Sequence, residues 1–186
     1  MKSKLYLGLV HYPVYNKFND VVTTSITNLD VHDIARSCLT YGVDKYFIIT
    51  PNEGQRLVLK TITEFWHTDI ARNYNSDRVE AIDIVEYTTS VQNLKEQIKN
   101  QEGTYPIIVT TTARKLAGQV SFKELKALDL KEQPLLLLFG TGNGLAREVI
   151  SLSDYVLEPI LGKGEYNHLS VRSAVAIILD RLSSEE

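Results

Sequence analysis

The sequence predicts an α/β protein built from parallel βα units, and three observations support this. Short apolar runs of strand length alternate with segments of helical periodicity along the whole chain. No internal repeat, low-complexity tract or long linker interrupts the alternation. At 186 residues, with 44% hydrophobic and 23% charged positions, the chain has the size of one globular domain. We therefore expect a single domain over residues 1–186.

Six apolar runs are the strand candidates. They cover residues 5–10, 45–50, 79–85, 107–111, 135–139 and 155–157. Helices are expected between them, where apolar residues recur at helical spacing. The first helix is capped by Asn28 or Asp30 and ends near Gly42. The others are expected over residues 53–72, 90–100, 121–128 and 169–182.

Two segments have features that the alternation of strands and helices does not explain. The long irregular loop 10–27 is of a length that usually carries function or disorder. The final helix carries a strongly apolar stripe, which needs a partner surface. Its members are Val171, Ala174, Val175, Ile178 and Leu182.

Composition excludes several classes of protein. The lone Cys38 has no partner for a disulfide or a cysteine metal site, so we expect no zinc and a reducing compartment. The first residues are too short an apolar run for a signal peptide or a membrane span, which favours a cytoplasmic protein. The net charge of −3 argues against unspecific binding to polyanions. Residues 1–60 carry seven basic and five acidic side chains, so contact with nucleic acid should favour that third.

A glycine turn follows the apolar strand 135–139. Glycines at positions 140, 142 and 144 permit positive φ and let a ligand approach the backbone. Leu145 stands where the dinucleotide fingerprint needs its third glycine, and too little chain remains for an ordinary nucleotide fold. Taken alone, the turn is better explained by strand-to-helix geometry than by a ligand site.

Four pieces of the chain together resemble a bacterial family of the SPOUT class of S-adenosylmethionine-dependent RNA methyltransferases. They read HYPVYNK at 11–17, TSITNLDVHDIAR at 24–36, LLLLFGTGNGL at 135–145 and YNHLSVRSAVAIILDRL at 166–182. The match spans nearly the whole chain. The resemblance implies a six-stranded, mostly parallel sheet with helices on both faces and a C-terminal trefoil knot. It also implies a homodimer that uses S-adenosylmethionine to methylate tRNA or rRNA, with no membrane and no metal.

The resemblance further implies a cofactor pocket made by the end of one strand and three later loops. Backbone groups and small polar side chains in such loops can bind the adenine and the ribose. The implied cofactor-binding residues are Thr110, Thr111, Thr112, Gly140, Thr141, Gly142, Asn143, Gly144, Glu158, Pro159, Ile160, Gly162, Asn167, His168, Leu169, Ser170, Val171 and Ser173. Asn143 stands where many relatives carry tryptophan.

Methyl transfer needs an acceptor held close to the methyl group and, where the acceptor bears a proton, a base. By resemblance, Arg36 with Asn28 upstream is the catalytic pair. An equally good interpretation makes Arg36 a surface residue of its helix, bonded to Asp33 or Asp30.

Substrate-binding candidates lie in the loop 10–27. His11, Tyr15 and Lys17 combine aromatic faces with a cation, which suits the stacking of an RNA base. The alternative is a loop whose tyrosines pack onto the core. His32 followed by Asp33 suggests a metal-dependent phosphohydrolase, but the further ligands of such a site are missing.

Two other functions compete with the methyltransferase. One is a noncatalytic SPOUT module that binds S-adenosylmethionine or RNA without transferring the methyl group. The other is a flavodoxin-like or Rossmann-like nucleotide-binding protein, which the late glycine turn fits poorly.

Overall fold

The computed structural model describes residues 4–128, 130, 132–164 and 166–184, and it has the predicted α/β architecture. A six-stranded sheet has the order β5-β4-β1-β7-β6-β8, and every neighbouring pair is parallel. The strands are β1 (Leu5–Val10), β4 (Lys45–Ile49), β5 (Val85–Thr88), β6 (Ile107–Thr110), β7 (Leu135–Gly140) and β8 (Tyr155–Val156). All their carboxyl ends therefore meet at one edge.

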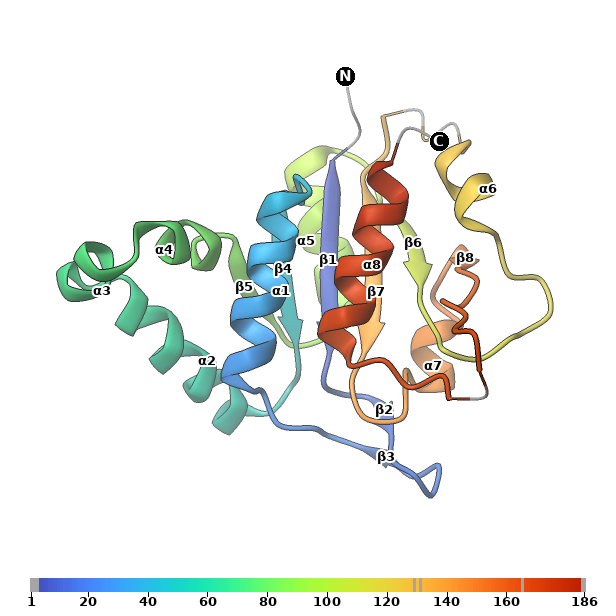
Figure 1. Ribbon diagram of the computed structural model, residues 1–186, viewed down its shortest axis with the longest axis horizontal. Coiled ribbons are helices and arrows are strands. Elements are labelled where there is room, and N and C mark those ends of the chain that lie inside the picture. Colours follow the sequence, from blue (N-terminus) through green and yellow to red (C-terminus); the bar gives the residue numbers. More distant parts are fainter. Residues whose placement is uncertain (1–3, 129, 131, 165, 185–186) are drawn as a thin grey trace.

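Helices cover both faces of the sheet. On β1, Leu7 and Leu9 face one core cluster, which also holds residues of α1 (Asn28–Thr40) and α8 (Val171–Ser183). Tyr6 and Val10 point to the other face and pack with α5 (Val91–Glu102) and α7 (Arg147–Ile150). This alternation is what a strand buried on both faces requires. Figure 1 shows α1 and α8 side by side on the near face.

The first helix is capped by Thr27, one residue before Asn28 and three before Asp30, the two predicted caps. Thr27 has an extended backbone, with φ −112°, and its hydroxyl accepts a hydrogen bond from the backbone N–H of Asp30 at 3.1 Å. Asn28 and Asp30, the predicted caps, therefore lie inside α1. Thr27 is the cap because its hydroxyl can accept a hydrogen bond from a backbone N–H of the first turn, which has no partner within the helix. Gly42, with φ +70°, follows the helix as predicted.

Two predictions are wrong in the segment between β4 and β5. The single helix 53–72 is divided into α2 (Glu53–Trp66) and α3 (Asp69–Tyr74), because Thr68 caps a new helix by accepting from Ala71 N–H. The predicted strand 79–85 is mostly α4 (Ser76–Ile82), and β5 begins only at Val85. Apolar and polar residues alternate there, but Val79 and Ile82 are buried three positions apart on a helix beside α1.

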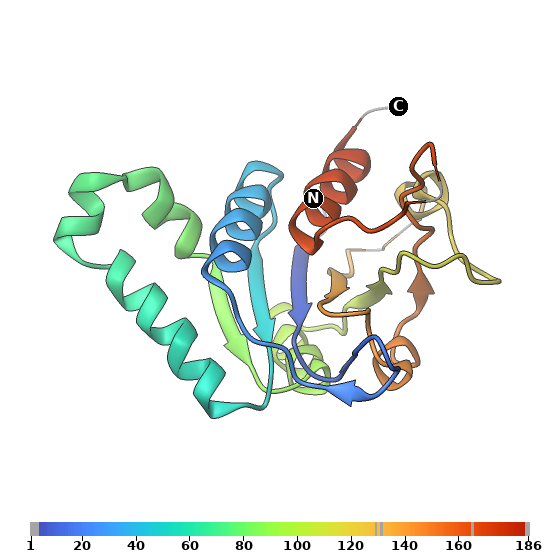
Figure 2. The same cartoon turned by 60° about the horizontal axis from the view of Figure 1, so that its bottom comes forward.

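These three helices project from the side of the sheet, as Figures 1 and 2 both show. We call α2, α3 and α4 the side lobe. It carries exposed apolar side chains on α2 and α3, namely Leu57, Val58, Phe65, Ile70 and Tyr74.

The loop 10–27 is more ordered than the sequence indicates. It contains a short antiparallel hairpin of β2 (Val14–Tyr15) and β3 (Val21–Val22), and the peptide bond Tyr12–Pro13 is cis. The hairpin pairs with the glycine turn: Tyr15 N–H donates to the Gly144 carbonyl at 2.9 Å. In Figure 2 it lies beside the loop that follows β7.

The apolar stripe of the final helix is covered in part by the same chain. Val175 and Ile178 are buried against the cluster shared with α1 and the sheet, whereas Val171, Ala174 and Leu182 are half-buried. The sheet and α1 therefore supply the partner surface for the centre of the stripe. The remaining helix, α6 (Phe122–Lys126), starts with a capping box of Ser121 and Glu124. In the described part of the chain, no helix is long and apolar enough to cross a membrane. The trefoil knot stays a prediction.

Candidate functional site

A cavity of about 720 Å³ opens where β6 and β7 end. Four segments far apart in sequence enclose it: the end of the loop 10–27 with the start of α1, the loop after β6, the glycine turn after β7, and the chain from β8 into α8. Its lining is Thr24, Ser25, Asp30, Thr111, Thr112, Ala113, Arg114, Phe139, Gly140, Thr141, Gly142, Asn143, Gly144, Ile160, Asn167, His168, Leu169, Ser170, Val171, Ala174 and Ile178. The volume is that of an ordinary small-molecule site.

The cavity brings together most of the residues assigned to a cofactor. Five of them do not line it: Thr110, Glu158, Pro159, Gly162 and Ser173. Thr110 is fully buried, with its hydroxyl 3.1 Å from that of Ser153. The Glu158 carboxylate accepts from the N–H of Phe122 at 2.9 Å, and Ser173 N–H donates to the capping hydroxyl of Ser170. The bonds of Thr110, Glu158 and Ser173 therefore stabilise the segments that form the cavity walls, and these residues do not line the cavity.

The glycines of the turn after β7 serve two different purposes. Gly142 has φ +58°, and a Cβ there would lie 2.8 Å from the Tyr15 carbonyl oxygen. That same oxygen accepts a hydrogen bond from Asn143 N–H at 2.8 Å. Gly142 thus makes room for the hairpin, and it also lines the cavity. Gly144 has φ +105°, lines the cavity, and has no protein atom within 4 Å of a Cβ, so it leaves backbone open to a bound molecule.

A buried histidine, His11, is connected to the glycine turn by a chain of hydrogen bonds through Thr24. His11 has no exposed surface, and its Nδ1 lies 3.0 Å from the hydroxyl of Thr24. That hydroxyl in turn is hydrogen-bonded to Thr141, which donates to the Val10 carbonyl at 3.0 Å. Burial lowers the pKa of His11 to about 4, which keeps the ring neutral at pH 7. The prediction that His11 stacks an RNA base was wrong, because the ring is enclosed.

Tyr15 and Lys17 lie outside the cavity lining. The Tyr15 hydroxyl accepts from the backbone N–H of Arg147 at 3.2 Å, which ties the hairpin to α7. Lys17 is exposed, with its Nζ 4.9 Å from the ring centroid of Phe18. Both residues keep a role in substrate binding as a prediction.

Asp30 is a cavity residue that the sequence did not reveal as such. It is nearly buried, and its carboxylate accepts from Arg172 at 3.0 Å and from the Thr27 hydroxyl at 2.6 Å. Arg172 also pairs with Asp33 at 3.3 Å. This ion pair joins α1 to the start of α8. It places a carboxylate in the wall of the cavity with its charge compensated.

The predicted catalytic pair lies away from this cavity. Arg36 and Asn28 are both exposed on α1, and neither lines the cavity of its own chain. The alternative interpretation, a bond from Arg36 to Asp30 or Asp33, is wrong because Arg172 takes both carboxylates. Arg36 forms no hydrogen bond or ion pair with any residue that the structure describes.

Sequence reasoning also missed several wall residues. Ala113, Arg114, Phe139 and Ala174 lie within two positions of predicted residues, so a search of neighbouring positions would have found them, whereas Thr24, Ser25, Asp30 and Ile178 reach the cavity through packing of the fold. The missed residues are Thr24, Ser25, Asp30, Ala113, Arg114, Phe139, Ala174 and Ile178. Within the described ranges, no cluster of three or more histidine, cysteine or acidic side chains can hold a metal ion.

A family model described as SAM-dependent RNA methyltransferase matches residues 4–184. The chain belongs to that family. As a SAM-dependent RNA methyltransferase, it takes S-adenosylmethionine as methyl donor, as the sequence resemblance implied. The third function, a flavodoxin-like or Rossmann-like protein, was therefore wrong.

Two relatives match nearly the whole of this chain. A protein of Aquifex aeolicus is 37% identical, with 99% of this chain and 90% of that protein covered. A tRNA (guanine-N(1)-)-methyltransferase of Oleidesulfovibrio alaskensis is 43% identical, but the match covers 96% of this chain and only 41% of the relative. The activity in that name therefore belongs to a protein more than twice as long.

Solved structures support the fold. The Aquifex aeolicus TrmH/SpoU tRNA modifying enzyme has a TM-score of 0.60 at 17% identity, with 98% of this chain and 75% of that chain covered. This likeness shows a fold shared with SPOUT enzymes.

The cavity fits the cofactor of the family. Phe139, Ile160 and Val171 give it apolar walls suited to an adenine ring, and Thr111 and Ser170 add hydroxyls. Gly144 leaves the backbone accessible between them. When bound, S-adenosylmethionine supplies an electrophilic methyl group on a sulfonium. The residues of the cavity would hold and orient it and exclude water.

Proposed function

We propose that this chain, as a single domain and a cytoplasmic homodimer, transfers methyl groups to tRNA or rRNA from a cofactor held in the 720 Å³ cavity. The observation that carries the proposal is the cavity itself, because the segments that the resemblance assigned to the cofactor converge on it. The names of the longer relatives add tRNA as a candidate substrate. A C-terminal trefoil knot belongs to the same proposal.

The homodimer is supported by where Arg36 and Asn28 lie. Both are exposed on α1 outside their own cavity, so a role beside the acceptor requires that they reach the cavity of a second copy. In this proposal Arg36, with Asn28, orients the acceptor and stabilises charge during transfer. Tyr15 and Lys17 contact the RNA from the hairpin.

The first experiment tests methyl transfer directly. The protein is incubated with radiolabelled S-adenosylmethionine and bulk undermethylated RNA, and the modified nucleotide is mapped by mass spectrometry. We expect label in one class of RNA. A protein that binds the cofactor but leaves every RNA unlabelled would be the noncatalytic module instead.

A second experiment tests the cavity. Ala174→Phe places a ring inside the cavity, whereas Ser183→Phe places the same ring at an exposed position at the far end of α8. Titration calorimetry should show lost cofactor binding in the first variant and retained binding in the second. Equal affinities would remove the cavity from the cofactor assignment.

A third experiment tests sharing between subunits. Arg36→Ala and Ala174→Phe should each be inactive alone. Co-expressed, they form mixed dimers in which one site keeps both an intact cavity and an intact arginine, so about a quarter of the wild-type activity returns. No recovery would mean that Arg36 serves the cavity of its own chain, and full activity of Arg36→Ala alone would mean that it has no role in transfer.

A further inference from the structure

Four exposed cations lie on the segments that follow β6, β7 and β8 around the cavity. Arg114 and Lys115 follow β6, Arg147 follows β7, and Lys163 follows β8. Since β7, β6 and β8 are neighbours in a parallel sheet, the loops that leave their carboxyl ends lie next to one another. We call these four residues the basic row. Arg114 also lines the cavity.

Among the residues that the structure describes, no partner compensates the charge of the basic row. None of its four side chains has a hydrogen bond or ion pair with the residues placed by the structure. Several cations elsewhere on the surface are paired, for example Lys4–Asp44 at 2.6 Å and Lys45–Glu86 at 2.9 Å. Glu148 is an exposed acid in the same loops, and Glu158 is bonded to a backbone N–H. In a chain of net charge −3, this edge is a local positive surface.

An exposed aromatic ring stands beside the same edge. Tyr166 is 79% exposed, and its ring meets that of His168 edge-on, with centroids 5.5 Å apart. His168 lines the cavity. A base stacked on Tyr166 would therefore lie close to a neighbouring nucleotide inside the cavity.

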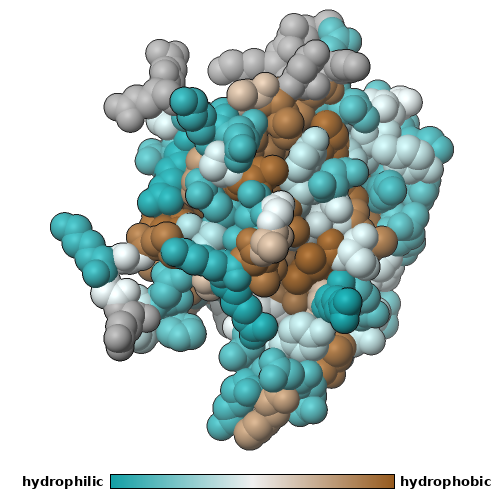
Figure 3. Space-filling model, turned by 90° about the vertical axis from the view of Figure 1, so that its right-hand side faces the viewer, coloured by the Kyte–Doolittle hydropathy of each residue, from teal (hydrophilic) through white to brown (hydrophobic). Residues whose placement is uncertain are grey.

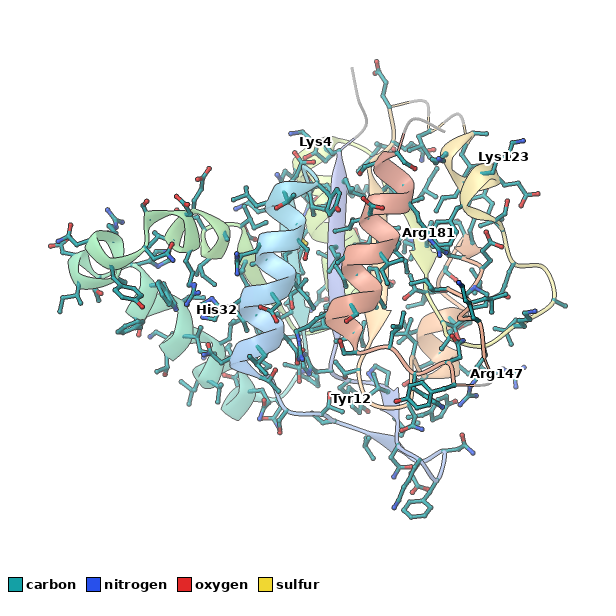
Figure 4. All side chains as sticks on the ribbon, viewed as in Figure 1. Lys4, Tyr12, His32, Lys123, Arg147 and Arg181 are labelled. Carbon is teal, nitrogen blue, oxygen red and sulfur yellow. The ribbon has the colours of Figure 1, made fainter. Side chains whose placement is uncertain are left out.

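Figure 3 shows the surface at this side of the molecule, and Figure 4 labels one residue of the basic row, Arg147. Figure 3 looks onto the β8 edge of the sheet, where hydrophilic side chains border hydrophobic ones. Exposed Leu116 and Leu161 belong to the same loops as the cations. Figure 4 shows Arg147 at the carboxyl edge of the sheet, and Lys4 and Lys123 at the opposite end.

We infer that the basic row and Tyr166 form the surface that receives a single-stranded segment of the RNA substrate. The cations contact successive phosphates, and Tyr166 stacks a base next to the nucleotide that enters the cavity. This inference rests on the proposed function. It moves the main contact with nucleic acid from the N-terminal third, where the net charge of the sequence placed it, to loops of the C-terminal half.

The salt dependence of RNA binding tests the cations. Each phosphate contact on a single strand contributes about 0.7 to the slope of log affinity against log salt. The variant Lys115→Gln/Arg147→Gln/Lys163→Gln, which spares the cavity wall, should lower that slope by about two. The control Lys60→Gln/Arg72→Gln/Lys123→Gln removes the same charge elsewhere on the surface and should leave the slope near that of the wild type. The probe is a fluorescein-labelled single-stranded RNA oligonucleotide of mixed sequence, measured by anisotropy over a range of KCl.

A pair of tyrosines tests the stacking. Tyr166→Ala should weaken binding of the same probe about tenfold, since stacking of one base contributes roughly that much. Tyr74 is as exposed, at 80%, but lies on the side lobe, so Tyr74→Ala should bind as the wild type does.

Calorimetry with S-adenosylmethionine separates the possible failures. Retained cofactor binding in the row variant, with a lower salt slope, supports the inference. An unchanged slope in a wild type that binds RNA would overturn this surface and leave the proposed function standing. A wild type that binds no RNA probe would overturn both. Equal binding of polyglutamate and RNA would assign the edge to an acidic protein partner instead.

Discussion

The loops after β4 and β5 differ from those after β6, β7 and β8, although all five strands end at the same edge. After β4 the chain turns at once into α2, capped by Asn52, and after β5 into α5, capped by Ser90. After β7 it makes the glycine turn instead, which is held by the hairpin. The cavity lies only on the second side. The carboxyl edge of a parallel sheet is therefore not sufficient for a binding site. The chain that follows the strands must also form loops there instead of entering a helix at once.

The largest expected effect is a difference in the free energy of unfolding between the alanine variants of two glycines that have positive φ. Gly42, behind α1, has no protein atom within 4 Å of a Cβ, whereas a Cβ on Gly142 would meet the Tyr15 carbonyl. Gly42→Ala should cost about 1 kcal/mol, from backbone conformation alone. Gly142→Ala should cost about 4 kcal/mol, because overpacking is added to the same strain. Urea unfolding measures both free energies.

Cofactor binding sharpens this contrast. Gly142→Ala should also weaken S-adenosylmethionine binding, because Tyr15 and Asn143 must separate and the turn loses its shape. Gly42→Ala should leave the affinity unchanged. Equal costs at the two glycines would contradict the view that the hairpin shapes the turn.

The next effect concerns pH and two histidines. His11 is buried behind the turn with a pKa lowered to about 4 from 6.5, whereas His67 is exposed on the side lobe beside Asp83. Between about pH 4, the pKa of His11 in the folded chain, and about pH 6.5, its pKa in the unfolded chain, the unfolded chain binds a proton at His11 and the folded chain does not. The free energy of unfolding therefore falls as the pH drops from about 6.5 to about 4, by about 3 kcal/mol in total.

Urea unfolding between about pH 7 and about pH 4 checks this. His11→Gln should remove that part of the pH dependence, and His67→Gln should keep it. The remaining slope includes His32, whose pKa is lowered by burial and by Arg78 and Arg36. A slope that is the same in the His11 variant and the wild type would show that its ring is already protonated or solvated when folded.

Much of the fold could be predicted from the sequence because it depends on local patterns. The strand 5–10 is found as predicted, and those at 45–50, 107–111, 135–139 and 155–157 are each within one residue of the prediction. Apolar runs bounded by turn residues determine such strands nearly by themselves. The pattern gave a wrong prediction for the segment 79–85. Its alternation of apolar and polar residues suits a strand, and only packing against α1 makes it helical.

The site could be predicted only in part. Glycines and small polar residues marked the turns after β7 and before α8, and the cavity does gather them. Thr24 and Asp30 belong to a distant segment, which reaches the cavity because β1 pairs with β7 and carries its loop there. The burial of His11 is likewise a tertiary property, as nothing near it in sequence distinguishes a stacking ring from an enclosed one.

The smallest effect compares two ion pairs, one at each region. Arg172 joins α8 to the nearly buried Asp30 in the cavity wall, whereas Lys60–Glu64 on the side lobe is a fully exposed pair at 3.5 Å. Arg172→Ala should cost about 2 kcal/mol, because it leaves a largely desolvated carboxylate with only Thr27 to compensate it. Lys60→Ala should cost about 0.4 kcal/mol, as expected for a solvated pair on a helix. Asp30→Asn in the Arg172→Ala background should recover most of the loss, since the unpaired charge is then gone. Failure to recover it would mean that Arg172 stabilises α8 by packing, and that the carboxylate in the cavity wall is solvated without it.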